Sequence, residues 1–151
     1  MASLHEVAHA VFPRLTPDNY RLSSPPSRDY NCIGWAAGET DEWWWPDGVW
    51  PAGVPKEETL AAFFAAFATL GYIPCASADQ EIGVEKVALY AVGDIPTHAA
   101  RQLSSGQWTS KLGLNVDIEH TTPEVIAGGV YGEVVAILAR KVAAEPPSAA
   151  R

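Results

Sequence analysis

Cysteine is scarce in this sequence: Cys32 and Cys75 are the only two among 151 residues. A short secreted scaffold that depends on disulfides carries four or more. We therefore expect no disulfide framework, and thiols that stay reduced in a cytosolic setting. One of the two thiols is then available for chemistry.

Basic residues are also few, with ten Lys and Arg against eighteen Asp and Glu and a formal net charge of −8. No basic patch is visible, so phosphate backbones would be repelled and we expect no nucleic-acid partner. No run approaches the roughly 18 apolar residues of a membrane span. Residues 1–15 lack the basic start and unbroken apolar stretch of a signal peptide. These absences predict a cytoplasmic protein with no membrane partner.

Enough apolar sequence remains for one folded domain. Hydrophobic residues make up 48% of the chain, close to the globular norm of about 45–50%, and the length suits a single folding unit. We expect one domain over residues 1–142, with an irregular Pro-rich arm over 13–31 and a disordered tail over 143–151.

The period of the hydrophobic pattern changes along the chain. One helix is expected to start near Cys32, followed by a Trp- and Pro-rich loop over residues 39–55 and a second helix between Pro55 and Gly71. Beyond Gly71 the period falls towards 2, and strands are expected at residues 72–77, 84–92, 97–103, 107–112, 115–120 and 131–139. Helices followed by an antiparallel sheet predict an α+β domain.

Cys32 stands where the extended arm is expected to become a helix. Unpaired backbone N–H groups and the positive end of a helix dipole stabilise a thiolate there and lower the pKa of the thiol from about 8.5. Such a thiol is a candidate nucleophile. The alternative is that Cys32 is a small buried apolar residue, which is also our interpretation of Cys75 inside an apolar strand.

His98 is expected to open a strand directly after a turn. Thiol catalysis needs an imidazole within about 3 Å of the sulfur, and the pairing of Cys32 with His98 would supply it. His120, at the end of a later strand, is the second candidate base. His5 and His9 are four residues apart on an expected N-terminal helix but have no third ligand, so we interpret them as a solvated face. No metal or organic cofactor is implied.

The order of a cysteine helix, a second helix and an antiparallel sheet with a histidine at its first exposed corner resembles the papain-like cysteine peptidase and amidase superfamily. The closest likeness is to its NlpC-type and CHAP-type branches. In the NlpC type a third polar residue lies about twelve positions after the histidine, where this chain has Ser110. A tyrosine about twelve residues before the nucleophile shapes the site in that type, and Tyr20 matches.

The resemblance implies a papain-like α+β fold in which N-terminal helices pack on a mainly antiparallel sheet. It assigns Cys32 as nucleophile and His98 as base, with Ser110 or Asp117 orienting the imidazole and Glu119 as a further alternative. It also implies a substrate site formed by Tyr20, Asn31, Trp35, Trp43 and Trp108. The runs over residues 86–90, 98–102, 108–113 and 117–120 additionally resemble an uncharacterised bacterial domain family.

These features predict a thiol-dependent hydrolase or acyltransferase acting on a peptide, isopeptide or side-chain amide. Two other functions stay open. One is a catalytically inactive papain-like module that binds a partner through its Trp-rich loop. The other is an acidic accessory or immunity-type protein, so a protein partner is compatible with the sequence.

Overall fold

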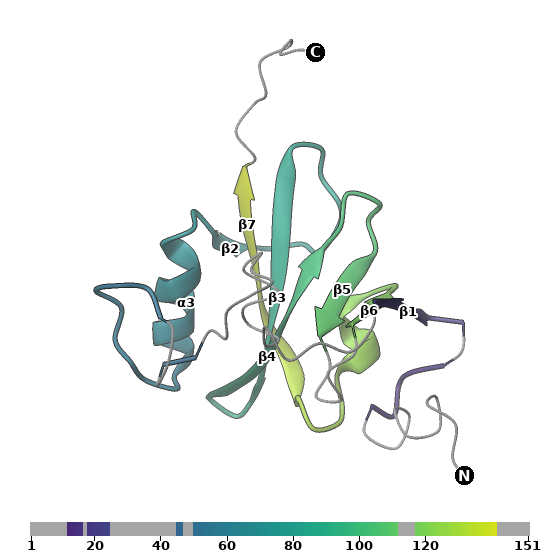
Figure 1. The fold of residues 1–151 in the computed structure, drawn as a ribbon, viewed down its shortest axis with the longest axis horizontal. Coiled ribbons are helices and arrows are strands. Elements are labelled where there is room, and N and C mark those ends of the chain that lie inside the picture. The colour runs from purple at the N-terminus through teal and green to yellow at the C-terminus, as the bar shows by residue number, and fades with distance from the viewer. Residues whose placement is uncertain (1–11, 17, 25–44, 47–49, 112–116, 142–151) are drawn as a thin grey trace.

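The computed structural model describes residues 12–16, 18–24, 45–46, 50–111 and 117–141. Within these ranges the chain forms seven β-strands, one α-helix and one short 3-10 helix (Figure 1). In chain order they are β1 (Tyr20–Ser24), α3 (Leu60–Ala68), β2 (Ile73–Cys75), β3 (Val84–Val92), β4 (Ile95–Gln102), β5 (Trp108–Lys111), β6 (Asp117–His120), η1 (Pro123–Ile126) and β7 (Glu133–Lys141).

All seven strands belong to one antiparallel sheet with the order β1-β6-β5-β4-β3-β7-β2. Strands β3 to β6 form a meander, and β7 returns to pair with β3 on its other side. Figure 1 shows α3 beside β2 at one edge of the sheet and β1 at the opposite edge.

The expected papain-like α+β fold with N-terminal helices is wrong for this chain. The described residues form a seven-stranded sheet with a single α-helix, which is richer in β-structure than that fold. The alternating pattern after Gly71 builds six of the strands, and the described residues between them form no other α-helix. The arm expected to be irregular supplies a further strand, because Tyr20 pairs with His120 of β6. The helix expected at Cys32 and the tail over 143–151 lie outside the described residues.

Helix α3 begins later than expected, at Leu60 rather than directly after Pro55. Thr59 caps it, because its hydroxyl accepts a hydrogen bond from the backbone N–H of Ala62 at 3.2 Å. The first turn therefore follows Glu57 and Glu58 rather than including them. The helix buries Phe63 and Phe67 completely against the sheet.

The strand pattern was predicted more closely than the helices. The expected strand over residues 84–92 is confirmed at both ends. Strand β4 starts at Ile95 rather than residue 97, because Gly93, with φ 59°, lets Val92 pair directly with Ile95 across a tight turn. The other strands are shorter than expected or displaced by one or two residues, apart from positions 112 and 115–116, which lie outside the described residues.

The two faces of the sheet carry separate cores. The face that we call the helix face packs Val87, Leu89 and Ala99 against α3, and Trp45 and Trp50 reach the same cluster. Both indoles contact Phe63, with ring centroids 5.3 and 5.1 Å away. No helix among the described residues is long and apolar enough to cross a membrane.

The other face, which we call the histidine face, carries His98 and His120 together with a second core. That core joins the sheet residues Tyr90, Ala100, Trp108 and Ile118 to side chains from the N-terminal segment and η1, among them Phe12, Leu15 and Ile126. Alternation along each strand places these sheet residues on one side. The candidate chemistry therefore lies on the face away from α3.

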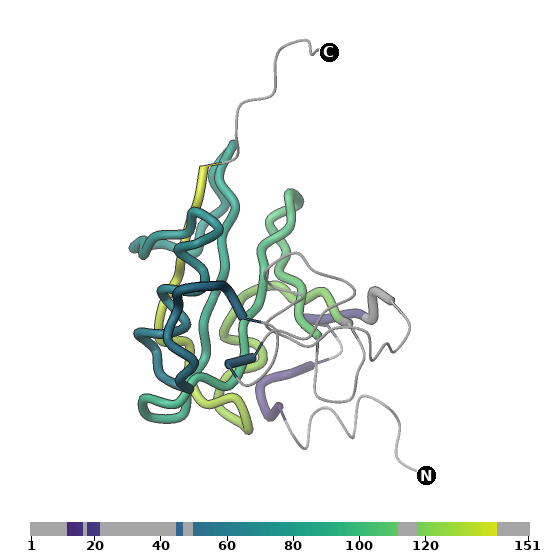
Figure 2. Tube along the Cα trace, turned by 60° about the vertical axis from the view of Figure 1, so that its left-hand side comes forward, coloured from purple at the N-terminus to yellow at the C-terminus, as the bar shows by residue number. Residues whose placement is uncertain are grey.

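Lys86 anchors the loop between β2 and β3 at the end of the sheet where β4 separates from β3. Pairing of these strands ends at Val87 and Arg101, and Figure 2 shows the turn after β4 standing apart from the nearby end of β3. The Lys86 side chain is fully buried and donates to the carbonyl oxygens of Ser77 and Asp79 at 2.7 and 2.6 Å. It also donates to the Glu81 carboxylate at 2.6 Å. These bonds fix the loop between β2 and β3 over the histidine face.

Gly132 allows the turn before β7 to lie directly against β3. Its φ is 73°, and a Cβ atom there would lie 2.1 Å from the carbonyl oxygen of Ala91. Its backbone N–H donates to Gly129 and its carbonyl accepts from Gly128. Only glycine satisfies both the backbone conformation and the close approach, so this residue fixes the position of the adjacent Tyr131.

We expect Gly132→Ala to lower the free energy of unfolding by about 2–4 kcal/mol, because left-handed strain adds to a clash with backbone. Gly93→Ala is the matched control: its φ is also positive, but nothing lies within 4 Å of the added Cβ. The control should cost about 1 kcal/mol. Urea unfolding curves of both variants measure the difference, and equal costs would contradict the proposed close approach.

Candidate functional site

His98 lies in β4 opposite Tyr90 of β3, at a position where the sheet is irregular. The register against β4 shifts between Tyr90 and Ala91, and the register against β7 shifts between Leu89 and Tyr90. Such irregularities redirect side chains and are over-represented beside active sites. Two of them flank the pair formed by Tyr90 and His98.

Aromatic rings enclose the His98 imidazole. Tyr131 stacks on it with centroids 4.0 Å apart and planes 7° apart, and Tyr90 meets it edge-on at 5.1 Å. The hydroxyl of Thr97 donates to the carbonyl oxygen of Tyr131 at 2.6 Å, which ties the stacking residue to the neighbour of His98. The imidazole is therefore held in one orientation by packing.

Neither ring nitrogen of His98 has a hydrogen-bond partner in the described part of the chain, although the side chain has no exposed surface. Leaving a buried polar group unsatisfied costs about 1–3 kcal/mol. Native proteins retain few such groups, and each requires an explanation in terms of strain, function or an additional partner. His98 is thus the position on this face most in need of a further interacting group.

Burial lowers the pKa of His98 well below 6.5, because an imidazolium would be desolvated there, and the nearby His120 lowers it further. The imidazole is neutral at neutral pH. A neutral imidazole has one nitrogen that donates a proton and one that accepts one. His98 can therefore act as a base towards a suitably placed donor.

His120 has both of its ring nitrogens satisfied. Nδ1 lies 2.8 Å from the carbonyl oxygen of Thr122, and Nε2 lies 2.8 Å from the hydroxyl oxygen of Ser110. A carbonyl only accepts, so Nδ1 carries the proton and Nε2 accepts from Ser110. Burial lowers the pKa of His120 to about 4, and the bond to Thr122 opposes this shift. Ser110 and His120 have no exposed surface.

The expected role of Ser110 in orienting His98 is wrong. Ser110 of β5 bonds the ring of His120 on the next strand, and no bond joins it to His98. Asp117 of β6 pairs with Lys111 of β5 in the backbone register. Glu119 pairs with Thr109 and lies by alternation on the face away from His120, where it forms an ion pair with Arg21 at 2.8 Å.

Two of the expected substrate residues do lie on the histidine face. Tyr20 of β1 stands opposite His120 and packs against the core, and burial raises the pKa of its hydroxyl. Trp108 also stands opposite His120 but is almost fully buried, with 1% exposed. Cys32, Asn31, Trp35 and Trp43 lie outside the described residues. Cys75 is only partly buried rather than in the core, and its thiol donates to the Ser77 carbonyl at 3.4 Å.

The sequence did not reveal the two tyrosines that enclose His98. Tyr90 carries a usable signal, because alternation in β3 places it on the same face as Ala88. Tyr131 follows two glycines and precedes a third, and nothing in that pattern predicts a stacked ring. Its position depends on the close approach at Gly132.

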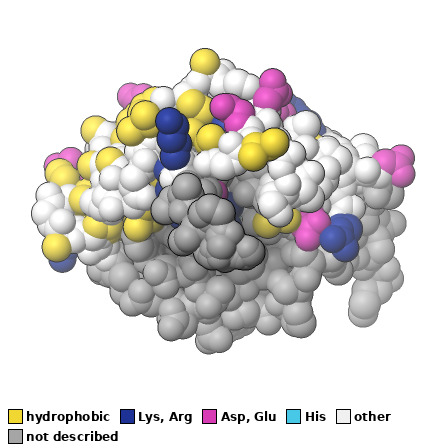
Figure 3. Space-filling view, turned by 90° about the horizontal axis from the view of Figure 1, so that it is seen from above, with side chains coloured by type: hydrophobic (Ala, Val, Ile, Leu, Met, Phe, Trp, Pro, Cys, Tyr) yellow, Lys and Arg dark blue, Asp and Glu magenta, His cyan; other side chains and the backbone are white. Residues whose placement is uncertain are grey.

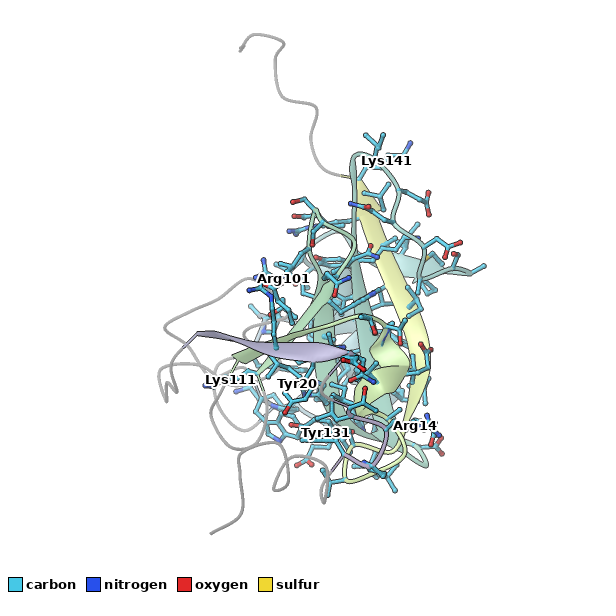
Figure 4. The ribbon with its side chains drawn as sticks, turned by 90° about the vertical axis from the view of Figure 1, so that its right-hand side faces the viewer. Arg14, Tyr20, Arg101, Lys111, Tyr131 and Lys141 are labelled. Carbon is cyan, nitrogen blue, oxygen red and sulfur yellow. The ribbon has the colours of Figure 1, made fainter. Side chains whose placement is uncertain are left out.

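The described charged side chains form neither a metal centre nor, on the face drawn in Figure 3, a patch of one sign. No three His, Cys, Asp or Glu side chains within the described ranges come together in a way that could hold a metal ion. Figure 3 shows acidic and basic side chains dispersed over the described surface visible there. Figure 4 shows Arg101 and Lys111 on the side of the sheet away from Arg14.

A protein-family model described as a domain of unknown function, DUF7689, matches residues 21–139, more than half of the chain. No curated protein and no solved structure matches.

The pKa of His120 predicts a loss of stability in acid. The unfolded histidine binds a proton below about 6.5, whereas the folded one binds it only near pH 4. Folding is therefore penalised as the pH falls through this window, and the penalty reaches about 3 kcal/mol at pH 4. Above pH 6.5 this histidine contributes no pH dependence. Urea unfolding between pH 4 and 7 should show the loss.

The matched variant is His120→Gln, which cannot titrate. Its stability should be lower than that of the native chain at pH 7, because the hydrogen bonds to Ser110 and Thr122 are altered. Its dependence on pH between 4 and 6.5 should be shallower. An unchanged slope would show that His120 does not titrate as described.

Proposed function

The chain belongs to the DUF7689 family, a domain of unknown function, and on that premise we propose that it is a thiol-dependent hydrolase or acyltransferase acting on an amide. In this proposal Cys32 is the nucleophile and His98 is the base. The amide belongs to a peptide, an isopeptide or an amide side chain. The proposal rests on the buried His98 imidazole and does not depend on a papain-like fold.

The observation that supports the proposal is the buried His98 ring without a hydrogen-bond partner in the described residues. A thiol is well suited to fill that position, because it is a weak donor to an imidazole and becomes a strong nucleophile once its proton is taken. Cys32 is the thiol that the sequence places at an expected helix start. Cys75 is already bonded to the carbonyl of Ser77.

The reaction follows from general thiol chemistry. The thiol proton of Cys32 passes to His98 as the sulfur attacks the amide carbonyl, forming a C–S bond and an oxyanion. The oxyanion collapses, the C–N bond breaks, and His98 returns the proton to the departing nitrogen. Water hydrolyses the resulting thioester in a hydrolase, or an amine accepts the acyl group in an acyltransferase.

The burial of His98 is compatible with this role. A base needs contact with the proton of the nucleophile rather than with solvent. Tyr131 stacks on the imidazole and Tyr90 meets its edge, so both protect it from water and fix its plane. Because the pKa of His98 is low, its neutral form, which is the form that accepts a proton, dominates at neutral pH.

Ser110 and His120 also show the geometry of a nucleophile and its base, with Oγ and Nε2 2.8 Å apart. A nucleophile has to reach the substrate, but Ser110 has no exposed surface and lines none of the described pockets. We therefore give this pair a structural role: it fixes β5 against β6 beside His98. Binding through the tryptophan loop is less favoured, since Trp45 and Trp50 pack on Phe63 in the helix-face core.

A cytoplasmic location is part of the proposal. A nucleophilic thiol must stay reduced, and the cytosol provides the reducing conditions for this. The proposal requires no metal or organic cofactor, because the nucleophile and base are side chains of this chain.

The direct test is the pH dependence of alkylation by iodoacetamide in a Cys75→Ser background, where Cys32 is the only thiol. We expect the pKa of Cys32 to lie below 8.5, because the imidazolium that forms when His98 takes the thiol proton stabilises the thiolate. Adding His98→Gln should return that pKa to about 8.5 and slow alkylation at pH 6–7 by about tenfold or more.

Circular dichroism and a urea unfolding curve establish that the His98→Gln variant is folded. His120→Gln is the matched control, since it removes a buried histidine from the same face without touching the proposed pair, and it should leave Cys32 more reactive than His98→Gln does. A Cys32 pKa near 8.5 in the native background, or one unaffected by His98→Gln in a folded variant, would rule out the proposed pair.

A further inference from the structure

A pocket of about 330 Å³ opens on the histidine face beside His120. Its walls come from residues 78–80 and 121–124, and Gln102, Gly106 and Trp108 complete the lining. The volume lies at the small end of the range for ligand pockets, about 300–1,000 Å³. Thr122 links the pocket to His120, because its carbonyl oxygen accepts a hydrogen bond from Nδ1–H of His120.

The walls of the pocket are fixed by buried donors. Lys86 donates to the carbonyl of Asp79, Gln102 donates to that of Ala78, and Tyr90 donates to that of Pro123 at 2.6 Å. These donors lie on β3 and β4, and their hydrogen bonds fix the backbone of both wall segments, residues 78–80 and 121–124, to the sheet. The pocket is thus a preformed hollow rather than a gap between loosely attached loops.

The side chains that remain available to a ligand are mainly acceptors. Gln102 is only 8% exposed, and its Nε2 is used by Ala78 at 3.0 Å. No described residue donates to its Oε1, so the amide oxygen of this lining residue stays available to a ligand. Asp79 and Glu124 add two exposed carboxylates that have no ion-pair partner among the described residues.

No basic residue lines the pocket. The buried ammonium of Lys86, which bonds the Asp79 carbonyl, also forms an ion pair with Glu81 at 2.6 Å, so its charge is balanced locally. The whole chain carries a net charge of −8, which favours the approach of cations. Two carboxylates and an amide oxygen in one hollow complement a group that carries several N–H donors and a positive charge.

We propose that this pocket binds an organic cation, a guanidinium or a primary ammonium, through Asp79, Glu124 and the side-chain oxygen of Gln102. The indole N–H of Trp108, which has no acceptor among the described residues, lines the same hollow and suits a carbonyl next to the cationic group. The side chain of an arginine or lysine residue, with its own amide, has this combination. The inference does not depend on the reactivity of Cys32.

The experiment titrates the full chain with N-acetyl-arginine amide, N-acetyl-lysine amide and N-acetyl-citrulline amide. The arginine and citrulline amides have side chains of equal length and differ only in the charge and composition of the head group. Binding is followed by NMR at the side-chain amide of Gln102 and the indole N–H of Trp108. Arginine or lysine should give saturable shifts at both positions. The uncharged citrulline amide should bind at least about tenfold more weakly, since it lacks the charge that both carboxylates recognise.

The double variant Asp79→Asn, Glu124→Gln should weaken binding of the cationic amides by about tenfold or more, whereas Asp94→Asn, in the exposed turn between β3 and β4, should leave it unchanged. Both variants keep side-chain size. Equal binding of citrulline and arginine amides, no saturable shift, or retained binding in the double variant would overturn the proposal. Repeating the titration with Cys32→Ala separates it from the proposed thiol chemistry, because cation binding should persist there.

Discussion

The stacking of Tyr131 on His98 is the contact on which the histidine face depends. It buries an imidazole at 4.0 Å from an aromatic ring and leaves both nitrogens without a partner in the described chain. The arrangement is unfavourable for a purely structural histidine, because desolvation is not offset by hydrogen bonds. Two strained features accompany this contact. The strand register is irregular on both sides of Tyr90, and Gly132 lies very close to the backbone of β3.

The buried polar side chains around His98 form hydrogen bonds, whereas His98 forms none with a described residue. His120 uses both ring nitrogens, Tyr90 bonds the carbonyl of Pro123, and Lys86 makes three bonds although it is fully buried. The fold is thus able to satisfy buried polar side chains beside His98. That His98 alone among these keeps two unused nitrogens is best explained by a partner of a different kind.

Much of the sheet was predictable from the sequence, and much of the site was not. Alternation in residues 84–92 determines β3 because side-chain burial repeats every two residues in a strand. His98 was expected to open a strand at an exposed corner, but it is an internal residue of β4 and is fully buried. Ser110 was expected to orient His98, but it bonds His120. Residue spacing along one hairpin does not show that β6 brings His120 next to Ser110. Strand β1 was missed because its pairing with β6 spans about a hundred residues, and local propensity carries no signal for it.

The central claim is that the His98 imidazole faces the thiol of Cys32, and NMR titration of the His98 ring in the native chain and in Cys32→Ala tests it most directly. A thiolate beside the ring raises the pKa of His98 and opposes the effect of burial. Removing the sulfur should therefore lower that pKa. An identical His98 titration in the two proteins would contradict the account and leave the imidazole without a chemical role.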